Sequence, residues 1–434
     1  LIGGRYMTLQ AWAALLIFLG TIVLAATGKM KTATASLLGA SVMVISGILS
    51  SEEAVAAIDH NTVGLLVGMM IVVGILSKSG LFQYLAVKAI KITGGRPLRI
   101  FWIISLLTAV LSAFLDNVTT VLLVTPVVLS LCELIAMNPL PLLMMELFAS
   151  NIGGTATLIG DPPNMIIASV AKFSFNEFLV VLAPVAVVAL CAVTAYVSIY
   201  YKKELKSDPE AAMRLREVDE SRLIVNRPLM IKSVAIIVLV LVGFSMHRLL
   251  HLEASVVALT AAGILLAVSL LDEGAIIHNE IEWPTIIYFI SLFIMAGGLK
   301  ATGVLEAVSK LLTAVLAGNP LLMLLGILWI SGITCAFINN IAFTAIFVHI
   351  IKSMALAAAI PPEPLYWALA LGACLGGNGT YFGAAANAVV ADFAAKEGIE
   401  IPFAAFSKIG LRVVFVSLLL SSIALLWIGR GLWM

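Results

Sequence analysis

Charged side chains are scarce in this chain of 434 residues, of which lysine, arginine, aspartate and glutamate together make up only 11%. Hydrophobic residues account for 62%, and the mean hydropathy is +1.13. No water-soluble core requires so much apolar sequence, so the composition predicts an all-α polytopic membrane protein whose surroundings are a lipid bilayer. The formal net charge of +1 gives no reason to expect a nucleic-acid partner.

Residues that carry enzyme chemistry are also few. The four cysteines, Cys132, Cys191, Cys335 and Cys374, lie in apolar segments without metal or CxxC spacing, so we interpret them as small core residues. No His-Glu-x-x-His motif occurs, and no serine–histidine or aspartate pair stands at catalytic spacing. We therefore predict no enzymatic activity, no catalytic residues and no cofactor apart from a coupling ion, Na⁺ or H⁺.

One offset of 223 positions recurs along the chain. It relates Asn117 to Asn340 and Asn164 to Asn387, and the register holds without gaps from about residue 58 to 169 against 281 to 392. The same offset relates Gly154 to Gly377, Thr157 to Thr380 and Gly160 to Gly383. Because apolar sequence does not match glycine and asparagine so often by chance, the chain is interpreted as two copies of one unit.

Apolar segments of about 20 residues predict where the chain crosses the membrane. After an N-terminal tail at 1–8, the first repeat (9–201) has expected spans at 9–27, 32–49, 62–77 and 178–201. The second repeat (230–434) has them at 230–246, 255–271, 285–299 and 406–428. Helices broken near the midplane by glycine or proline, at 142–171 and 365–391, bring the total to ten spans. The hydrophilic segment 202–229 is predicted to be a cytoplasmic linker.

Two long apolar segments are interrupted by polar residues near their middle. Asp116-Asn117 interrupts 97–137 and Asn339-Asn340 interrupts 320–360, so each segment is predicted to be a re-entrant hairpin with two short arms. With the linker in the cytoplasm, most lysines and arginines lie on the cytoplasmic side, as the positive-inside rule requires. Each repeat then has five spans, so the two repeats are inverted relative to each other, as in secondary transporters.

The hairpin tips and the broken helices are the predicted binding region, because irregular backbone at membrane depth must line a polar cavity or be buried in protein. Freed carbonyl groups and the side chains of asparagine and threonine bind cations, and half-helix N-termini attract anions. The candidate ion- or substrate-binding residues are Asp116, Asn117, Thr119, Thr120, Gly154, Thr157, Gly160, Asp161, Asn164, Asn339, Asn340, Thr344, Gly377, Asn378, Thr380, Gly383 and Asn387. A Na⁺ ion near Asn117, Asp161 and Asn340 is the metal site that this set suggests.

Structural interpretations compete with functional ones at several acidic and basic residues. Asp116 and Asp161 each precede a helical segment, so the competing interpretation is that each simply caps the N-terminus of that helix and binds no ion. Glu146 is expected near the cytoplasmic rim, where a role in the site is the weaker interpretation. His349 lies on an apolar hairpin arm and is better explained as a packed histidine than as a proton relay.

At these residues the chain resembles the ion transporter superfamily. The segments AFLDNVTT, NIGGTATLIGDPPN, FINNIAFTA and LGACLGGNGTYFGAAAN look like those of melanosomal P-protein-like transporters. The superfamily also includes arsenite efflux permeases, NhaD-type sodium/proton antiporters and divalent-anion/sodium symporters. The resemblance implies a homodimer whose scaffold is made by the first three spans of each repeat. It also implies a mobile domain of hairpins and broken helices that moves as an elevator.

In the symporters of this superfamily, hairpin tips and broken helices form paired sodium sites. The resemblance transfers these sites to Asn117 with the kink at 153–164, and to Asn340 with the kink at 376–387. This chain departs from the symporters at Asp116 and Asp161, where they have a small hydroxyl residue and a threonine. P-protein-like sequences tend to have aspartate where this chain has Asn339. The added carboxylates in the first repeat suit a bound Na⁺ or H⁺ better than a doubly anionic substrate.

We therefore expect a secondary active ion transporter of the elevator type, coupled to a cation, with Na⁺ or H⁺ exchange as the simplest case. Efflux of an anion or oxyanion such as chloride or arsenite is the alternative, and a passive anion channel is a third possibility. The expected partners are a small ion and a second copy of the chain, in the cytoplasmic membrane of a prokaryote.

Overall fold

The computed structural model describes residues 8–27, 29–206, 220–246, 249–316 and 319–428, and the regular structure in these ranges is helical. Nine helical stretches of 18 to 26 residues are long and apolar enough to cross a membrane, and three shorter apolar helices accompany them. The chain is therefore an all-α, multi-pass integral membrane protein. The predicted tail at 1–8 lies outside the described residues except for Thr8, and so do residues 207–219 of the predicted linker.

The two halves of the chain have the same order of helices. The first half comprises α1 (Leu9–Ala26), α2 (Thr32–Ile45), α3 (Ser51–Ala56), α4 (His60–Ser77), α5 (Leu81–Ile92), α6 (Pro97–Phe114), α7 (Asn117–Leu134), α8 (Leu140–Gly154), α9 (Pro162–Ala171), α10 (Phe175–Val181) and α11 (Ala183–Tyr200). The second half comprises the short 3₁₀ helix η1 (Glu220–Leu223), α13 (Arg227–Met246), α14 (Ala254–Ser269), α15 (Glu273–Asn279), α16 (Trp283–Ala301), α17 (Val304–Val315), α18 (Pro320–Phe337), α19 (Asn340–Ala358), α20 (Glu363–Gly376), α21 (Ala385–Lys396) and α22 (Phe403–Ile428). Each helix from α16 to α21 begins 223 residues after its counterpart from α4 to α9.

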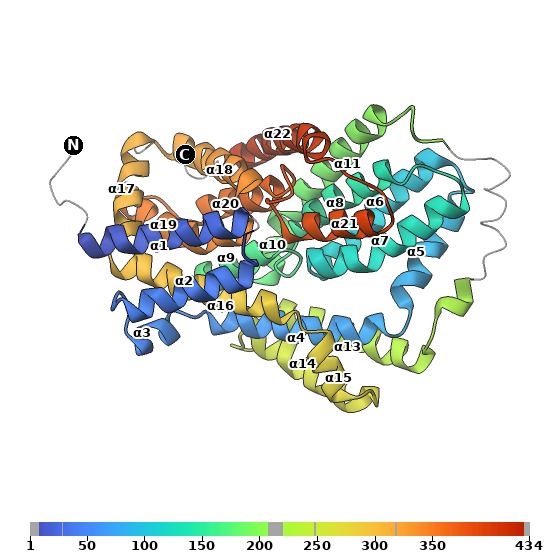
Figure 1. Ribbon diagram of the computed structural model, residues 1–434, viewed down its shortest axis with the longest axis horizontal. Coiled ribbons are helices and arrows are strands. Elements are labelled where there is room, and N and C mark those ends of the chain that lie inside the picture. Colours follow the sequence, from blue (N-terminus) through green and yellow to red (C-terminus); the bar gives the residue numbers. More distant parts are fainter. Residues whose placement is uncertain (1–7, 28, 207–219, 247–248, 317–318, 429–434) are drawn as a thin grey trace.

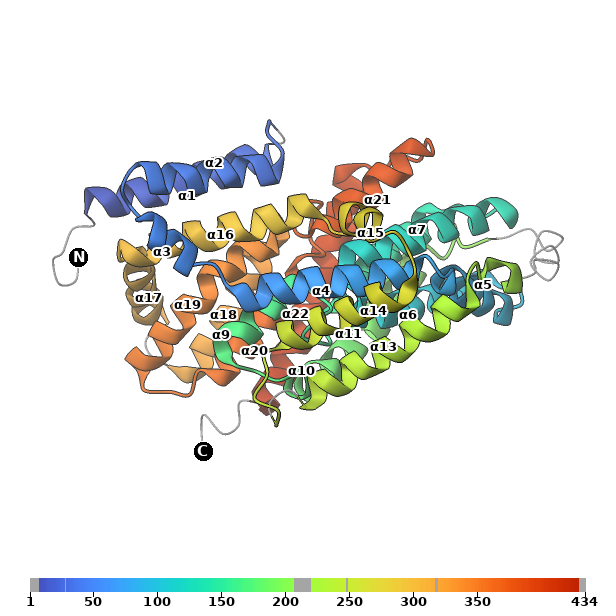
Figure 2. The ribbon, with the colours of Figure 1, turned by 90° about the horizontal axis from the view of Figure 1, so that it is seen from below.

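Each predicted hairpin is a pair of long helices, α6 with α7 and α18 with α19 (Figure 1). The arms have 18 or 19 residues, about 27 Å at 1.5 Å per residue, so the expectation of short arms was wrong. The physical reason is that α6 and α18 start at a proline in the first turn and continue to the extended residues Leu115 and Ile338. By length and composition, nine long helices, the four hairpin arms among them, are candidate spans and α1, α2 and α14 are shorter, so ten spans with two re-entrant hairpins stays a prediction. The two pairs lie at opposite ends of the long axis (Figures 1 and 2).

The helices α4 and α16 each pack against the first two membrane helices of the other half. In Figure 2, α4 lies beside α13 and α14, whereas α16 lies beside α1 and α2, and the packing contacts agree. Small residues permit the close approach of α4 to α14: a Cβ on Gly68 would lie 2.6 Å from the backbone carbon of Ala258. Such small residues are typical of packed membrane helices, where van der Waals contact replaces the hydrophobic effect.

The broken helices also connect the two halves. The helix α8 ends at Gly154 and α9 starts at Pro162, after which α9 packs on α19 and α20 of the second half. In the same way α21 leaves α20 and packs on α7 and α8 of the first half. Both hairpin tips and both kinks are therefore brought together in the interior of the molecule.

Candidate functional site

The two kinks are held by the same hydrogen bonds in both halves. Asn164 Nδ2 donates to the carbonyl oxygens of Gly154 and Thr157, at 3.4 and 2.8 Å, and also to that of Thr155. Asn387 Nδ2 donates to the oxygens of Gly377 and Thr380, at 2.7 and 2.9 Å. These bonds occupy carbonyl groups that the helix break leaves without helical partners, which is why asparagine follows each break by the same number of residues.

The two predicted threonines of the kinks fasten them to the hairpins. Thr157 donates its hydroxyl to the carbonyl oxygen of Ala113 at the end of α6. Thr380 donates to the carbonyl oxygen of Ala336 at the end of α18, at 2.6 Å. Each hairpin and its neighbouring kink consequently form one hydrogen-bonded unit.

Glycine is required where the first kink meets the first hairpin tip. A Cβ on Gly154 would lie 2.4 Å from Asn117 Oδ1 and 2.6 Å from the carbonyl oxygen of Gly160. A Cβ on Gly160 would in turn lie 2.5 Å from the carbonyl oxygen of Ser112. These three oxygens therefore converge on this kink, and oxygens are the ligands that hard cations take. In the second half, Gly383 lies close to the carbonyl oxygens of Gly377 and Cys335 in the same manner.

The two aspartates of the first half behave differently. Asp116 caps α7, because its Oδ1 accepts from the backbone N–H of Thr119 at 2.9 Å and its Oδ2 accepts from the Thr119 hydroxyl at 2.5 Å. Asp161 stands at the N-cap position of α9 but makes no capping bond, so the capping interpretation does not describe it. Its Oδ1 accepts from Asn340 Nδ2 at 3.5 Å, and its Oδ2 has no partner among the described residues although Asp161 is only 1% exposed.

The second hairpin tip is hydrogen-bonded to α16 and to its own kink. Asn339 Oδ1 accepts from the backbone N–H of Ile341 and from the hydroxyl of Tyr288 on α16. The backbone N–H of Asn340 donates to the carbonyl oxygen of Gly383 at 3.1 Å. The hydroxyl of Thr344, like that of Thr120 in the first hairpin, is buried without a partner in the described part of the chain.

Asn151 on α8 is a central residue that the sequence analysis missed. Its Nδ2 donates to Asn378 Oδ1 at 3.0 Å and to Asn387 Oδ1 at 3.2 Å, and its Oδ1 accepts from Asn117 Nδ2 at 3.1 Å. One side chain thus joins the first hairpin tip to the second kink. The repeat gave no signal for it, since the position 223 residues later is Cys374.

A cavity of about 700 Å³ lies between these breaks and the helices α1, α2 and α16. Asp116, Asn117, Asp161, Asn339 and Asn340 line one wall. Lys31, Glu282 and Tyr288 also line this cavity, and they are three residues that the sequence analysis did not name as candidates. Three carboxylates and one lysine face this space, so the cavity favours cations.

The cavity-lining residues near α16 lie at its N-terminal end, whereas Leu66 and Met70 lie in the middle of α4. Glu282 precedes α16, and Glu280 close by forms an ion pair with Lys78 at the end of α4, at 2.6 Å. Val225 lies in the segment between η1 and α13 and donates its backbone N–H to the carbonyl oxygen of Ser79, the residue after Lys78. Part of the cavity lining, Glu282 among it, therefore lies near the linker end of α4 and α16.

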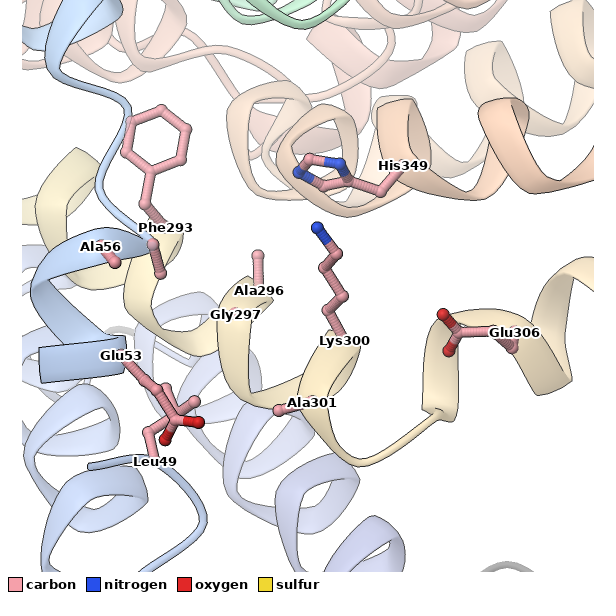
Figure 3. Close-up of a pocket in the computed structure, with 11 residues that line it drawn as sticks. Leu49, Glu53, Ala56, Phe293, Ala296, Gly297, Lys300, Ala301, Glu306 and His349 are labelled. Carbon is pink, nitrogen blue, oxygen red and sulfur yellow. The ribbon is translucent and has the colours of Figure 1, made fainter.

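A second cavity of about 640 Å³ lies at the opposite end of α16. Figure 3 shows the Lys300 ammonium pointing toward the His349 imidazole, with Glu53 and Glu306 farther away around the same space. His349 is half-buried and lines this cavity, and its interpretation as a packed histidine stays a prediction. Glu146 needs a correction: it is fully buried in α8 rather than at a rim, because α6, α7 and α11 cover the helix that carries it.

Comparisons with known proteins agree with this architecture. A family model described as "Citrate transporter" matches residues 22–372. The "46 kDa membrane protein" of Mycobacterium leprae is 38% identical over 420 residues, which cover 95% of this chain and 97% of that protein. The "P protein" of Sus scrofa is 32% identical over 94% of this chain and 58% of its own length. The structure is also similar to the crystal structure of the Alcanivorax borkumensis YdaH transporter, with a TM-score of 0.58, 15% sequence identity and 98% coverage of both chains. At this identity the similarity shows the fold alone.

Proposed function

The chain belongs to the citrate transporter family and is a membrane transporter, and from this premise we propose that it is a secondary active transporter coupled to a cation. Exchange of Na⁺ or H⁺ is the simplest form of that coupling. The observation that carries the proposal is Asp161, a buried carboxylate at a helix break with one oxygen that no described residue satisfies.

The energetic argument for Asp161 rests on its surroundings. A charged carboxylate inside a membrane protein costs several kcal/mol unless a cation or a proton compensates it. The side chains that reach Asp161 are those of Asn340 at 3.5 Å, Asn117 and Cys374, and because all three are neutral they do not compensate its charge. Na⁺ favours the ionised carboxylate and a proton favours the neutral one, so the two compete for one group. That competition is sufficient for an exchanger that loads one cation at a time.

The mode of movement that we propose is an elevator. The hairpins lie at opposite ends of the molecule, which supports inverted repeats whose tips meet at the membrane midplane (Figure 1). The half-helices α9 and α21 each pack on the opposite half of the chain, so they join both hairpins and both kinks into one unit. In this proposal that unit moves as a whole against α4 and α16. Because part of the cavity lining lies near the linker end, the structure corresponds in this proposal to the state open to the cytoplasm.

We also propose a homodimer in a bacterial cytoplasmic membrane. Its interface would involve α13 and α14, from which no residue lines the central cavity. Their outward faces carry exposed apolar side chains, among them Val238, Leu239 and Leu259. Cross-linking between cysteines at two of these positions in membranes tests the interface, and a protein that stays monomeric in bilayers contradicts it.

The second candidate function is transport of an organic anion, which the family description favours. Half-helix N-termini at α9 and α21 face the interior and attract anions. Asp116, Asp161 and Glu282 around the cavity oppose a multiply charged anion unless a cation enters with it. A passive anion channel has less support, since the carboxylates repel its ion.

The deciding experiment uses proteoliposomes that contain a pH-sensitive dye. Gradients of Na⁺, Li⁺, K⁺, Cl⁻, citrate and arsenite are imposed in turn on the wild type, on Asp161→Asn and on Asp392→Asn, whose carboxylate is exposed on α21. We expect the wild type and Asp392→Asn to couple a cation gradient to a pH change, and Asp161→Asn to lose at least tenfold of that rate. Unchanged Na⁺ and pH dependence in a folded Asp161→Asn protein would refute the proposal.

A further inference from the structure

Glu146 is a buried carboxylate that the proposed ion site does not use. It has no exposed surface and is not among the residues that line the central cavity. Thr125 Oγ1 on α7 donates to Glu146 Oε1 at 2.7 Å, whereas Oε2 has no hydrogen-bond partner within the described residues. An ionised carboxylate in such a place is strongly disfavoured unless something positive joins it.

No described cation is in position to do so. The charged residues on the helices α6, α7, α11, α20, α21 and α22, which pack against α8, are all exposed: Arg99, Glu133, Glu363, Asp392, Lys396, Lys408 and Arg412. The titratable group within electrostatic reach is the neutral thiol of Cys132 on α7. A proton on Oε2 is therefore the simplest compensation, and it requires no ligand beyond those present.

A strip of buried polar side chains extends from the cavity toward Glu146. Asn117 lines the cavity, and Ser112 Oγ donates to Asn117 Oδ1 at 2.8 Å. Ser150 Oγ lies 3.3 Å from the Ser112 hydroxyl, and Glu146 precedes Ser150 by four residues on the same face of α8. Four residues correspond to a rise of about 6 Å along the helix axis. Thr120, whose buried hydroxyl has no partner among the described residues, lies on α7 between Asn117 and Thr125.

The second repeat lacks this strip. At the offset of 223 residues, Ser112, Thr120, Thr125, Glu146 and Ser150 are replaced by Cys335, Phe343, Val348, Leu369 and Ala373. Each replacement is less polar, and the corresponding helices α18, α19 and α20 pack in the same arrangement. The fold therefore has no structural need for polar residues at these positions. Their presence in one repeat alone indicates a functional requirement.

We propose that Glu146 is a proton-binding site of the transport cycle, separate from the central cavity and reached from it along this strip. The proposal rests on the cation-coupled transport proposed above and assigns one proton to a named group. In the step itself, a hydronium ion in the cavity passes its proton along the hydroxyl groups to Glu146 Oε2 and becomes water. The carboxylate becomes a neutral acid, Thr125 keeps its bond to Oε1, and the proton leaves by the reverse transfer in the other state.

Two kinds of variant test the site without relying on a destabilised protein. Glu146→Gln keeps the shape but cannot titrate, and the double change Glu146→Leu with Thr125→Val copies the residues of the second repeat. Glu133→Gln on α7 is the matched control, because its carboxylate is exposed. Thr120→Val removes a hydroxyl from the strip and leaves the carboxylate in place.

The first measurement is infrared difference spectroscopy across a pH titration of the purified protein. We expect a carboxylic acid carbonyl band that both Glu146 variants lose and Glu133→Gln and Thr120→Val retain. A wild-type spectrum without a band that depends on Glu146 would overturn proton binding. This readout does not require transport, so it stays decisive even if the wild type moves no ion in the gradient panel and the proposed function fails.

The second measurement is proton flux in proteoliposomes. We expect both Glu146 variants to lose at least tenfold of the proton flux, Thr120→Val to slow it several-fold, and Glu133→Gln to match the wild type. The double variant decides between coupling and packing, because its side chains already pack in the second repeat. Wild-type proton flux with an unchanged pH profile in the folded Glu146 variants would show that the carboxylate is structural and the proposal wrong.

Discussion

Gly154 is the position where one added carbon atom tests the proposed ion site most directly. A Cβ there would lie 2.4 Å from Asn117 Oδ1 and 2.6 Å from the carbonyl oxygen of Gly160. The Gly160 oxygen is backbone, and the Asn117 amide is held by Ser112 and Asn151, so neither can turn aside freely. Gly154→Ala must therefore separate the first hairpin tip from the first kink.

The size of the effect follows from these contacts. Overpacking of this kind costs about 1–3 kcal/mol of stability. If the Asn117 oxygen also ceases to face a bound cation, the loss of about 1.5–3 kcal/mol corresponds to a Kd for Na⁺ raised roughly ten- to hundredfold. Gly263→Ala on α14 is the control, because a Cβ there meets nothing within 4 Å and alanine favours a helix by about 0.5–1 kcal/mol.

The assay is thermal unfolding of the detergent-solubilised protein over a series of NaCl concentrations, with choline chloride holding the ionic strength constant. A ligand that binds the folded state raises Tm with concentration, and that dependence yields Kd. We expect Gly154→Ala to unfold earlier and to need much more Na⁺ for the same shift, while Gly263→Ala behaves like the wild type. If Gly154→Ala unfolds at the wild-type temperature and binds Na⁺ equally well, the tip and the kink do not form one site.

Three further changes have expected outcomes. Asn164→Ala and Asn387→Ala each leave two or more buried carbonyl groups without a hydrogen-bond donor, so each should lower the free energy of unfolding by about 2–4 kcal/mol in denaturant unfolding. A loss confined to one repeat would contradict their matching roles. Asp116→Asn should keep the α7 cap within about 0.5 kcal/mol while Asp116→Ala costs about 1 kcal/mol, and equal stabilities would mean that the cap contributes nothing. Gly68→Val should push α4 away from Ala258 on α14 and lower Tm markedly, whereas an unaltered Tm would show that this contact tolerates a larger spacing.

Local sequence was sufficient to predict the class of fold and the positions of the breaks. Apolar segments predicted the membrane helices, and glycine, proline and asparagine at one offset predicted where α8 and α20 stop. These features are local, because a helix ends where its own residues cannot continue it. The predicted hairpin bounds, 97–137 and 320–360, are close to those of the observed helix pairs, although each arm is long enough to span a membrane and is not short.

Only the tertiary structure decided which of these residues meet. Asn151 has Cys374 at the matching position of the other repeat, so the search for repeated residues could not find it, whereas Glu282 matches the acidic Asp59 and was overlooked. Glu146 looked peripheral because it follows a loop by six residues, yet α6, α7 and α11 bury it completely. The sequence by itself determined a helical membrane transporter with two breaks in each repeat. The exchange of α9 and α21 between the halves decided that Asp161 faces Asn340, because contact between residues 179 positions apart depends on packing and not on any local pattern.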